Sequence, residues 1–223
     1  MYTSFTQFSA EVKPILETLV RAGKITSGKI SKTDHLDMPI YLKAYWAVYN
    51  NAKNADGQRL IAGVLDDLKD AHGVYDKTSV MRSGNILQVH GTTWSILLND
   101  CWIMGGIHGG ATFELASYAE QKNLFNLSHT DKDPDDYAFR VTGREILGLL
   151  HFGYSQSSCA PSSLSRSVGI KSLLRSTNPK KAKAATFTEY HQIVEQTTQS
   201  YLANDASRAN VVGKLLGLKA LTS

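Results

Sequence analysis

The sequence has few cysteines, no long hydrophobic run and only a small excess of one charge. Two cysteines in 223 residues do not make a disulfide framework, which excludes the small disulfide-stapled domains of secreted proteins. The 24 Lys and Arg residues outnumber the 20 Asp and Glu residues, for a net charge of +4. This excess is mild, so the composition carries no strong nucleic-acid signal of the kind that a dedicated basic binder shows.

Hydrophobic residues are too interrupted for a membrane span. The longest apolar segment, Trp94–Ile107, is broken by Asn99, Asp100 and a pair of glycines, and it is shorter than the ~18 residues that a span needs. The first residues, Met1–Phe5, contain no basic residue followed by an apolar run, so we expect no Sec-type signal peptide. We therefore expect synthesis in the cytoplasm, with export only by a specialised machine that reads no such signal.

The amino-acid composition is that of a globular protein. Hydrophobic residues make up 42% of the chain and charged residues 20%, which excludes intrinsic disorder and collagen-like repeats. The length fits a single domain over residues 1–223. Within it we expect a helical N-terminal segment (1–83), a strand-containing core (84–154) and a helical C-terminal segment (155–223). The predicted fold class is α+β, with the helical segments around a small central β-sheet.

Apolar residues spaced three and four positions apart predict helices in the N-terminal segment. The first runs from Ser4 to Gly23, and Pro14 is expected to kink or restart it. Pro39 opens the second helix, which carries an aromatic cluster. A third helix is expected from about Asp56 to His72.

Three short strands are expected in the core segment, over residues 86–90, 112–116 and 137–141, where short apolar runs or alternating residues stand between polar stretches. The capping box Thr142–Glu145 then begins a helix that ends at Gly153.

The C-terminal segment is predicted to be a loop followed by helices. The serine-rich stretch 155–167 is expected to be irregular, with a helix over 161–174 that begins at a proline. Residues 180–183 are interpreted as a basic linker. The capping box 186–189 begins a longer helix, and a last helix includes residues 211–216.

Two motif-like stretches fail the requirements of the sites that they resemble. Gly23–Lys29 has most of a phosphate-binding loop, but Ile30 replaces the hydroxyl residue and a predicted helix, rather than a strand, precedes it. The acidic stretch Asp131–Asp136 has the alternate spacing of a calcium loop, but it lacks the glycine at position six and the glutamate at position twelve. We therefore expect neither a metal site nor a cofactor.

The densest group of chemically useful residues lies in Val89–Gly110, which contains two histidines, two tryptophans, an Asn-Asp pair and several glycines. Glycines allow the backbone to approach a ligand closely. A strand that ends at His90 would deliver its side chain into a loop, where functional sites are often built. We interpret this stretch as a candidate part of a functional site.

The two cysteines have different surroundings. Cys101 lies among Leu98 and Trp102–Met104, so we expect a buried and inert thiol. Cys159 lies in the polar serine-rich stretch, near the start of the helix predicted after Pro161. The amide dipoles at a helix N-terminus stabilise a thiolate, which makes Cys159 the candidate nucleophile.

These features suggest a thiol-dependent hydrolase that acts on an amide or an ester by papain-like chemistry. Cys159 would be the nucleophile and His90 or His108 its base, with His151 a further candidate base. Asn99 or Asp100 would orient the base, and Trp94 and Arg144 would bind substrate. The likeness to papain-like enzymes is an analogy of architecture, because the chain contains no diagnostic motif.

Two other functions stay open. The first is a binding or inhibitor protein without enzymatic activity, in which Trp94, Trp102 and the cluster Tyr41–Trp46 form an aromatic partner surface. The second is an enzyme on a phosphate- or nucleotide-containing substrate, with Arg144, His90 and Asp100 in the pocket. A compact domain without a signal peptide also suits a bacterial effector or toxin, whose partner would be a cognate inhibitor protein.

Overall fold

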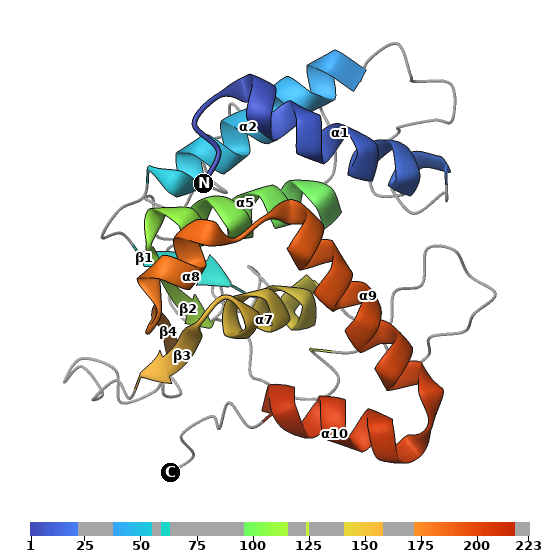
Figure 1. Ribbon diagram of the computed structural model, residues 1–223. Helices are drawn as coiled ribbons and strands as arrows, with labels where there is room; N and C mark the ends of the chain where they lie inside the picture. Colours follow the sequence, from blue (N-terminus) through green and yellow to red (C-terminus); the bar gives the residue numbers. More distant parts are fainter. Residues whose placement is uncertain are drawn as a thin grey trace, which may run out of the picture.

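The chain forms an α+β fold, as the sequence predicts. The computed structural model describes residues 1–21, 38–54, 59–62, 96–115, 124, 141–157 and 172–216. Within these ranges the structure has seven helices and one small sheet of four strands (Figure 1). None of the helices in these ranges combines the length and the apolar character that a membrane span requires.

Two N-terminal helices form one layer of the molecule. Helix α1 spans Phe5–Arg21 and helix α2 spans Met38–Lys53, with Pro39 in the first turn of α2 as predicted. The predicted restart at Pro14 is wrong, because α1 continues through this residue. Pro14 lies on the exposed face of α1, where water can bond to the carbonyl that a proline leaves unpaired.

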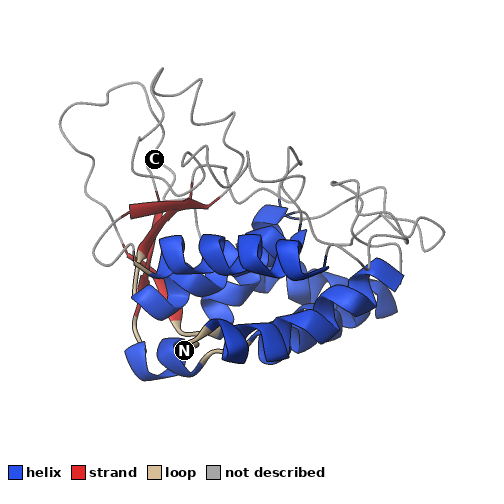
Figure 2. Cartoon of the chain, turned by 90° about the horizontal axis from the view of Figure 1, so that it is seen from above, coloured by secondary structure: helices blue, strands red, loops and turns tan. Residues whose placement is uncertain are grey.

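The sheet combines one parallel pair with two antiparallel pairs. Its strands are β1 (Arg59–Ala62), β2 (Thr112–Leu115), β3 (Tyr154–Ser157) and β4 (Ser172–Ser176), in the order β1-β2-β4-β3. Strands β1 and β2 are parallel, whereas β4 is antiparallel to both β2 and β3. Figure 2 shows the strands together along one side of the helices.

Only one of the four strands was predicted as such. Strand β2 confirms the strand expected over 112–116. Strand β1 lies where a helix was expected over 56–72, β3 lies in the expected serine-rich loop, and β4 replaces the end of the helix expected over 161–174. The reason is physical: a short apolar run such as Leu60-Ile61 fits a strand as well as a helix, and only its pairing partner decides. The other two predicted strands fall outside the described residues, except Val141, which begins a helix.

Helix α5 (Ile96–Gly109) is the core of the molecule. All residues from Leu97 to His108 are buried, because the helix lies between the α1–α2 layer and the helices that follow it (Figure 1). A helix that is apolar around its whole circumference needs such complete burial. Residues 96–109 of the stretch that was expected to take part in a functional site are therefore a buried helix.

The glycines of α5 allow close helix packing. A Cβ atom at Gly105 would lie 2.2 Å from the Tyr49 carbonyl oxygen, and one at Gly109 would lie 2.3 Å from the Lys53 carbonyl oxygen. On a neighbouring face, a Cβ atom at Gly106 would lie 2.5 Å from the Phe113 ring of β2. These glycines bring the backbone close to neighbouring elements, and not to a ligand as the sequence suggested.

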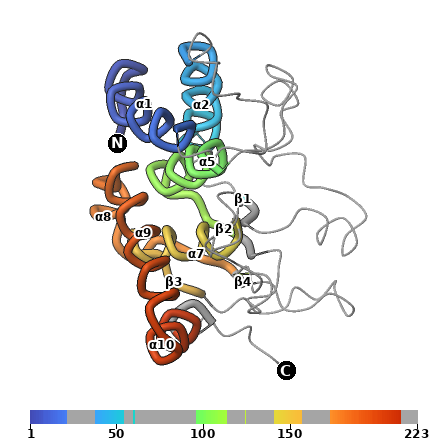
Figure 3. The backbone as a smooth tube through the Cα atoms, turned by 90° about the vertical axis from the view of Figure 1, so that its right-hand side faces the viewer, coloured from blue at the N-terminus to red at the C-terminus, as the bar shows by residue number. Residues whose placement is uncertain are grey.

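Four further helices complete the fold: α7 (Val141–His151), α8 (Pro179–Ala184), α9 (Phe187–Ala203) and α10 (Asp205–Leu216). Helix α7 confirms the predicted helix that ends before Gly153, although it begins one residue before the predicted capping box. The predicted basic linker over 180–183 is wrong, because these residues form α8. Figure 3 shows α8, α9 and α10 along one edge of the molecule, with α7 between α9 and the sheet.

One of the two hydrogen bonds of the capping box predicted at the start of α9 is present. Thr186 is the N-cap, and its Oγ1 accepts a hydrogen bond of 3.1 Å from the Glu189 amide. The Glu189 carboxylate, however, contacts His151 at 2.8 Å. It therefore ties α9 to the end of α7.

Candidate functional site

A buried ion pair joins the central helix to α7. The Arg144 guanidinium donates two hydrogen bonds to Asp100, from Nε to Oδ1 at 2.8 Å and from Nη2 to Oδ2 at 2.7 Å. Asp100 is completely buried and Arg144 is 6% exposed. Both carboxylate oxygens are therefore held in a fixed plane by a two-pronged contact.

A histidine from the C-terminal helix α9 completes this group. His191 Nε2 lies 3.1 Å from Asp100 Oδ2, although the N–H direction is not aligned well enough for a hydrogen bond. Such looseness is common in catalytic pairs before substrate binds. Asp100, Arg144 and His191 come from α5, α7 and α9, and we call these three residues the Asp100 cluster.

The carboxyl group of Asp100 is ionised at neutral pH. Burial alone raises the pKa of this carboxyl group, because it disfavours the charged form. The charge and hydrogen bonds of Arg144, together with the contact to His191, outweigh burial and hold the pKa of Asp100 at about 2. The cluster therefore contains a permanent buried negative charge that faces a histidine.

Tyr190 fixes the position of α9 against this cluster. Its hydroxyl donates a hydrogen bond of 3.1 Å to the Arg144 carbonyl oxygen, and the Arg144 guanidinium lies 5.4 Å from its ring centroid. A Cβ atom at Gly148 would lie 2.2 Å from the Tyr190 ring, so only glycine lets the ring lie this close to α7. Burial raises the pKa of Tyr190, and its hydroxyl stays neutral.

The second ring nitrogen of His191, Nδ1, forms no hydrogen bond within the described part of the chain. The His191 side chain is 19% exposed. A carboxylate that faces one nitrogen of an imidazole favours the proton on that nitrogen and leaves the lone pair of the other outward. This is the arrangement of a general base and the residue that orients it.

His108, one of the predicted bases, belongs to a different and fully occupied network. Its Nδ1 lies 2.8 Å from the Tyr49 hydroxyl, and its Nε2 lies 2.8 Å from the Ala185 carbonyl oxygen. Because a carbonyl only accepts, Nε2 carries the proton and Nδ1 accepts from Tyr49. Burial, and then the positive charges of the N-terminus and Lys53, lower the pKa of His108 to about 4. The neutral ring thus joins α2, α5 and the segment after α8.

A second histidine–carboxylate pair lies at the end of α7. His151 Nε2 is 2.8 Å from Glu189 Oε1, and both side chains are partly exposed, at 26% and 43%. His151 was also a candidate base, so the pair offers a natural comparison with His191 and Asp100. In the ranges that the structure covers, no three His, Cys, Asp or Glu side chains gather closely enough to hold a metal ion.

Some of the other predicted site residues lie outside the described residues, and the rest are buried. Cys159, His90 and Trp94 lie outside the described residues. Asn99 is buried next to Asp100. Cys101 is buried, and burial raises the pKa of its thiol, which confirms the predicted inert cysteine.

The aromatic clusters that were expected at the surface lie mainly in the core. Trp102 and Tyr45 are 0% and 4% exposed, and Trp46 stacks on Tyr49 with ring centroids 5.4 Å apart. Arg144, expected to bind substrate, is engaged by Asp100. These residues therefore stabilise the fold in this structure.

Sequence reasoning missed His191 and Tyr190. Phe187, Tyr190 and Val194 form the buried side of α9, and His191 lies at helical spacing from both Phe187 and Val194. A histidine at the edge of an apolar stripe was the available signal. Comparison of the chain with protein-family models, with curated proteins and with solved structures gives no match.

Proposed function

We propose that the protein is a thiol-dependent hydrolase in which His191, oriented by Asp100, is the general base for Cys159. The observation that carries the proposal is the 3.1 Å contact between the buried Asp100 carboxylate and His191 Nε2. The sequence suggested Asn99 or Asp100 as the residue that orients a histidine, with His90 or His108 as that histidine. His191 replaces them in the proposal because it faces Asp100 and has an open nitrogen.

The proposed reaction uses this open nitrogen as a proton carrier. His191 Nδ1 takes the proton of the Cys159 thiol, and the thiolate attacks the carbonyl carbon of an amide or ester. The amine or alcohol leaves with the proton from His191, and the acyl group remains on sulfur as a thioester. Water, activated by the same nitrogen, then releases the carboxylic acid and regenerates the thiol.

The Asp100 carboxylate supports this cycle by electrostatics. A fixed negative charge beside the imidazole stabilises the imidazolium that forms when the thiol loses its proton. Arg144 keeps that carboxylate ionised and fixes its plane. Arg144 thereby acts through Asp100 and does not bind substrate.

Alkylation of the two cysteines by iodoacetamide, measured across pH and read by mass spectrometry, tests the proposal. In the native protein we expect Cys159 to react with an apparent pKa well below the ~8.5 of an ordinary thiol. His191→Gln should return the profile of Cys159 to that of an ordinary thiol. Cys101, which is buried, should react slowly in every variant.

His151→Gln is the matched control, because it removes the histidine of the other histidine–carboxylate pair, which joins α7 to the same helix α9. It should leave the Cys159 profile unchanged. An ordinary thiol profile in the unaltered protein, or equal effects of the two substitutions, would refute the proposal.

The two alternative functions receive less support from the described residues. An aromatic partner surface would need exposed rings, but Trp102 and Tyr45 are buried. A phosphate-binding arginine would need a free guanidinium, whereas Arg144 holds Asp100 in a two-pronged contact.

A further inference from the structure

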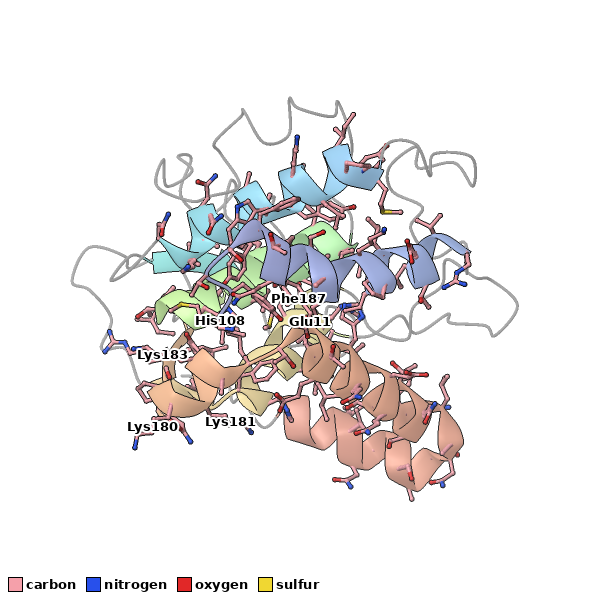
Figure 4. The ribbon with its side chains drawn as sticks, turned by 45° about the horizontal axis from the view of Figure 1, so that its top comes forward. Glu11, His108, Lys180, Lys181, Lys183 and Phe187 are labelled. Atoms are coloured by element: carbon pink, nitrogen blue, oxygen red, sulfur yellow. The ribbon has the colours of Figure 1, made fainter. Side chains whose placement is uncertain are left out.

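A lysine-rich corner lies on helix α8, which precedes the helix that carries His191. The N-cap of helix α8 is Asn178, whose Oδ1 accepts a hydrogen bond of 3.0 Å from the Lys181 amide. Ala182 and Ala185 are 1% exposed and fasten this short segment to the core. Lys180, Lys181 and Lys183 are exposed and gather at the end of the molecule where α8 lies (Figure 4). We call these three residues the α8 lysines.

The charge around the α8 lysines is of one sign. Residues 172–188 contain Arg175 and the α8 lysines but no Asp or Glu, a local charge of +4. This equals the net charge of the whole 223-residue chain. No described residue forms an ion pair or a side-chain hydrogen bond with an α8 lysine.

Two further cations extend this basic corner. The Met1 ammonium donates a hydrogen bond of 2.9 Å to the Lys183 carbonyl oxygen, and Lys53 Nζ donates one of 3.2 Å to the Tyr2 carbonyl oxygen. Burial, and then the charge of Lys53, lower the pKa of the Met1 ammonium. Lys53 therefore lies close enough to the Met1 ammonium for the two positive charges to repel each other.

Glu11, whose charge acts on the Met1 ammonium, is already hydrogen-bonded within the protein. Glu11 accepts a hydrogen bond of 2.8 Å from the Thr188 amide through Oε1 and one of 2.5 Å from the Tyr2 hydroxyl through Oε2 (Figure 4). It therefore neutralises the start of α9 and does not reach the lysines. The α8 lysines have no ion-pair partner among the described residues, whereas the charge of Glu11 partly offsets that of the Met1 ammonium.

We propose that the α8 lysines form a docking surface for the phosphate backbone of double-stranded nucleic acid, bound weakly and without sequence preference. Lysine is a strongly hydrated point charge that suits phosphate contacts, whereas it is depleted in the centre of protein–protein interfaces.

The surroundings of the α8 lysines favour a duplex over other polyanions. Single-stranded nucleic acid is held by exposed aromatic rings on which bases stack, and no large aromatic residue of the described part is exposed. Stable attachment to a membrane surface needs an apolar anchor in addition to charge. Met1 is the sole exposed large apolar residue among those described in this corner. A cationic patch with few exposed aromatic or apolar side chains among the described residues suits contacts with the phosphate backbone of a duplex.

Salt dependence of binding to a short DNA duplex of mixed sequence tests this inference. Each neutralised phosphate contributes about −0.9 to the slope of log K against log salt, so three lysines predict a slope of about −2.7. This slope corresponds to a roughly 40-fold loss of affinity between 50 and 200 mM salt. The triple variant Lys180→Gln/Lys181→Gln/Lys183→Gln should lose most of the slope and bind at least ~10-fold more weakly at 50 mM salt.

The matched control removes three exposed cations from α1 and α2 by Lys13→Gln, Arg21→Gln and Lys43→Gln. It changes net charge equally and should leave duplex binding within about twofold. Equal losses in both triple variants would show that only net charge matters and would overturn the inference. Preference for a single strand of the same length would also overturn it, as would binding to vesicles with anionic phospholipids but not to the duplex. Circular dichroism of both variants verifies that the helices are retained.

Discussion

At the scale of single residues, the Asp100–Arg144 pair is the feature with the largest energetic consequence. Removal of two charges from water is costly, and only close geometry and complete hydrogen bonding offset this loss. The pair has that geometry, with contacts of 2.7 and 2.8 Å. A sequence pattern cannot reveal such a pair, because Asp100 and Arg144 are 44 positions apart and no local spacing relates them.

Arg144→Met is expected to lower the free energy of unfolding by about 3–5 kcal/mol, because it leaves the Asp100 carboxylate buried without its partner. The double variant Asp100→Leu/Arg144→Met removes both charges and should be more stable than Arg144→Met alone. Urea unfolding of the four proteins in this cycle provides the measurement.

The dependence of stability on acid pH is an independent test of the contribution of Asp100. The pKa of Asp100 is lowered from 3.8 to about 2 in the folded state, so the stability that it adds is complete above about pH 4. It is lost as the pH falls from 3.8 toward 2. The difference in the free energy of unfolding between the unaltered protein and the double variant should shrink in this window. Strictly additive losses of this free energy in the cycle, together with a difference that does not change with pH, would contradict the account.

At the scale of elements, the helices follow from the sequence better than the sheet does. The caps and apolar periodicity of α1, α2, α7, α9 and α10 are local signals, and the structure has a helix at each of these places. Strands β1, β3 and β4 depend on partners distant in sequence, which no local pattern contains. Helix α5 was missed because burial on all sides removes the polar face that reveals an amphipathic helix.

Gly105→Ala is expected to destabilise the protein by about 1–3 kcal/mol, because its new Cβ atom would meet the Tyr49 carbonyl oxygen at 2.2 Å. Gly213→Ala in α10 is the matched control, since nothing lies within 4 Å of the position of its Cβ atom. This control should gain up to about 1 kcal/mol from helix propensity. Thermal unfolding measures both, and an equal gain at Gly105 would show that α5 is not packed against α2 as described.

At the scale of the whole molecule, residues near the N-terminus hold helix α9, which contributes His191. The Tyr2 hydroxyl accepts a hydrogen bond of 3.0 Å from the Phe187 amide at the start of α9, and the Tyr2 amide donates one of 3.3 Å to the Tyr49 hydroxyl. Tyr49 in turn contacts His108, which binds the segment between α8 and α9. This buried chain of hydrogen bonds ties α9 to α2 and α5 and so fixes the frame in which His191 meets Asp100.

The candidate site could be predicted from the sequence only in part. Asp100 was one of two candidate orienting residues, with Asn99, but the histidine that it faces was not a candidate, because the pairing of α5 with α9 is a property of the tertiary fold. The interpretation of Cys101 as buried and inert is confirmed, since its apolar neighbours are adjacent in sequence. The roles of Cys159 and His90 stay predictions.

The most direct test of the central claim is the tautomer of His191, read from nitrogen chemical shifts and proton–nitrogen couplings of the neutral ring. The account predicts a proton on Nε2, toward Asp100, and a free lone pair on Nδ1. His108 provides an internal reference, because its Nε2 faces the Ala185 carbonyl oxygen at 2.8 Å and must carry the proton. A proton on Nδ1 of neutral His191 would contradict the claim that Asp100 orients this histidine as a base.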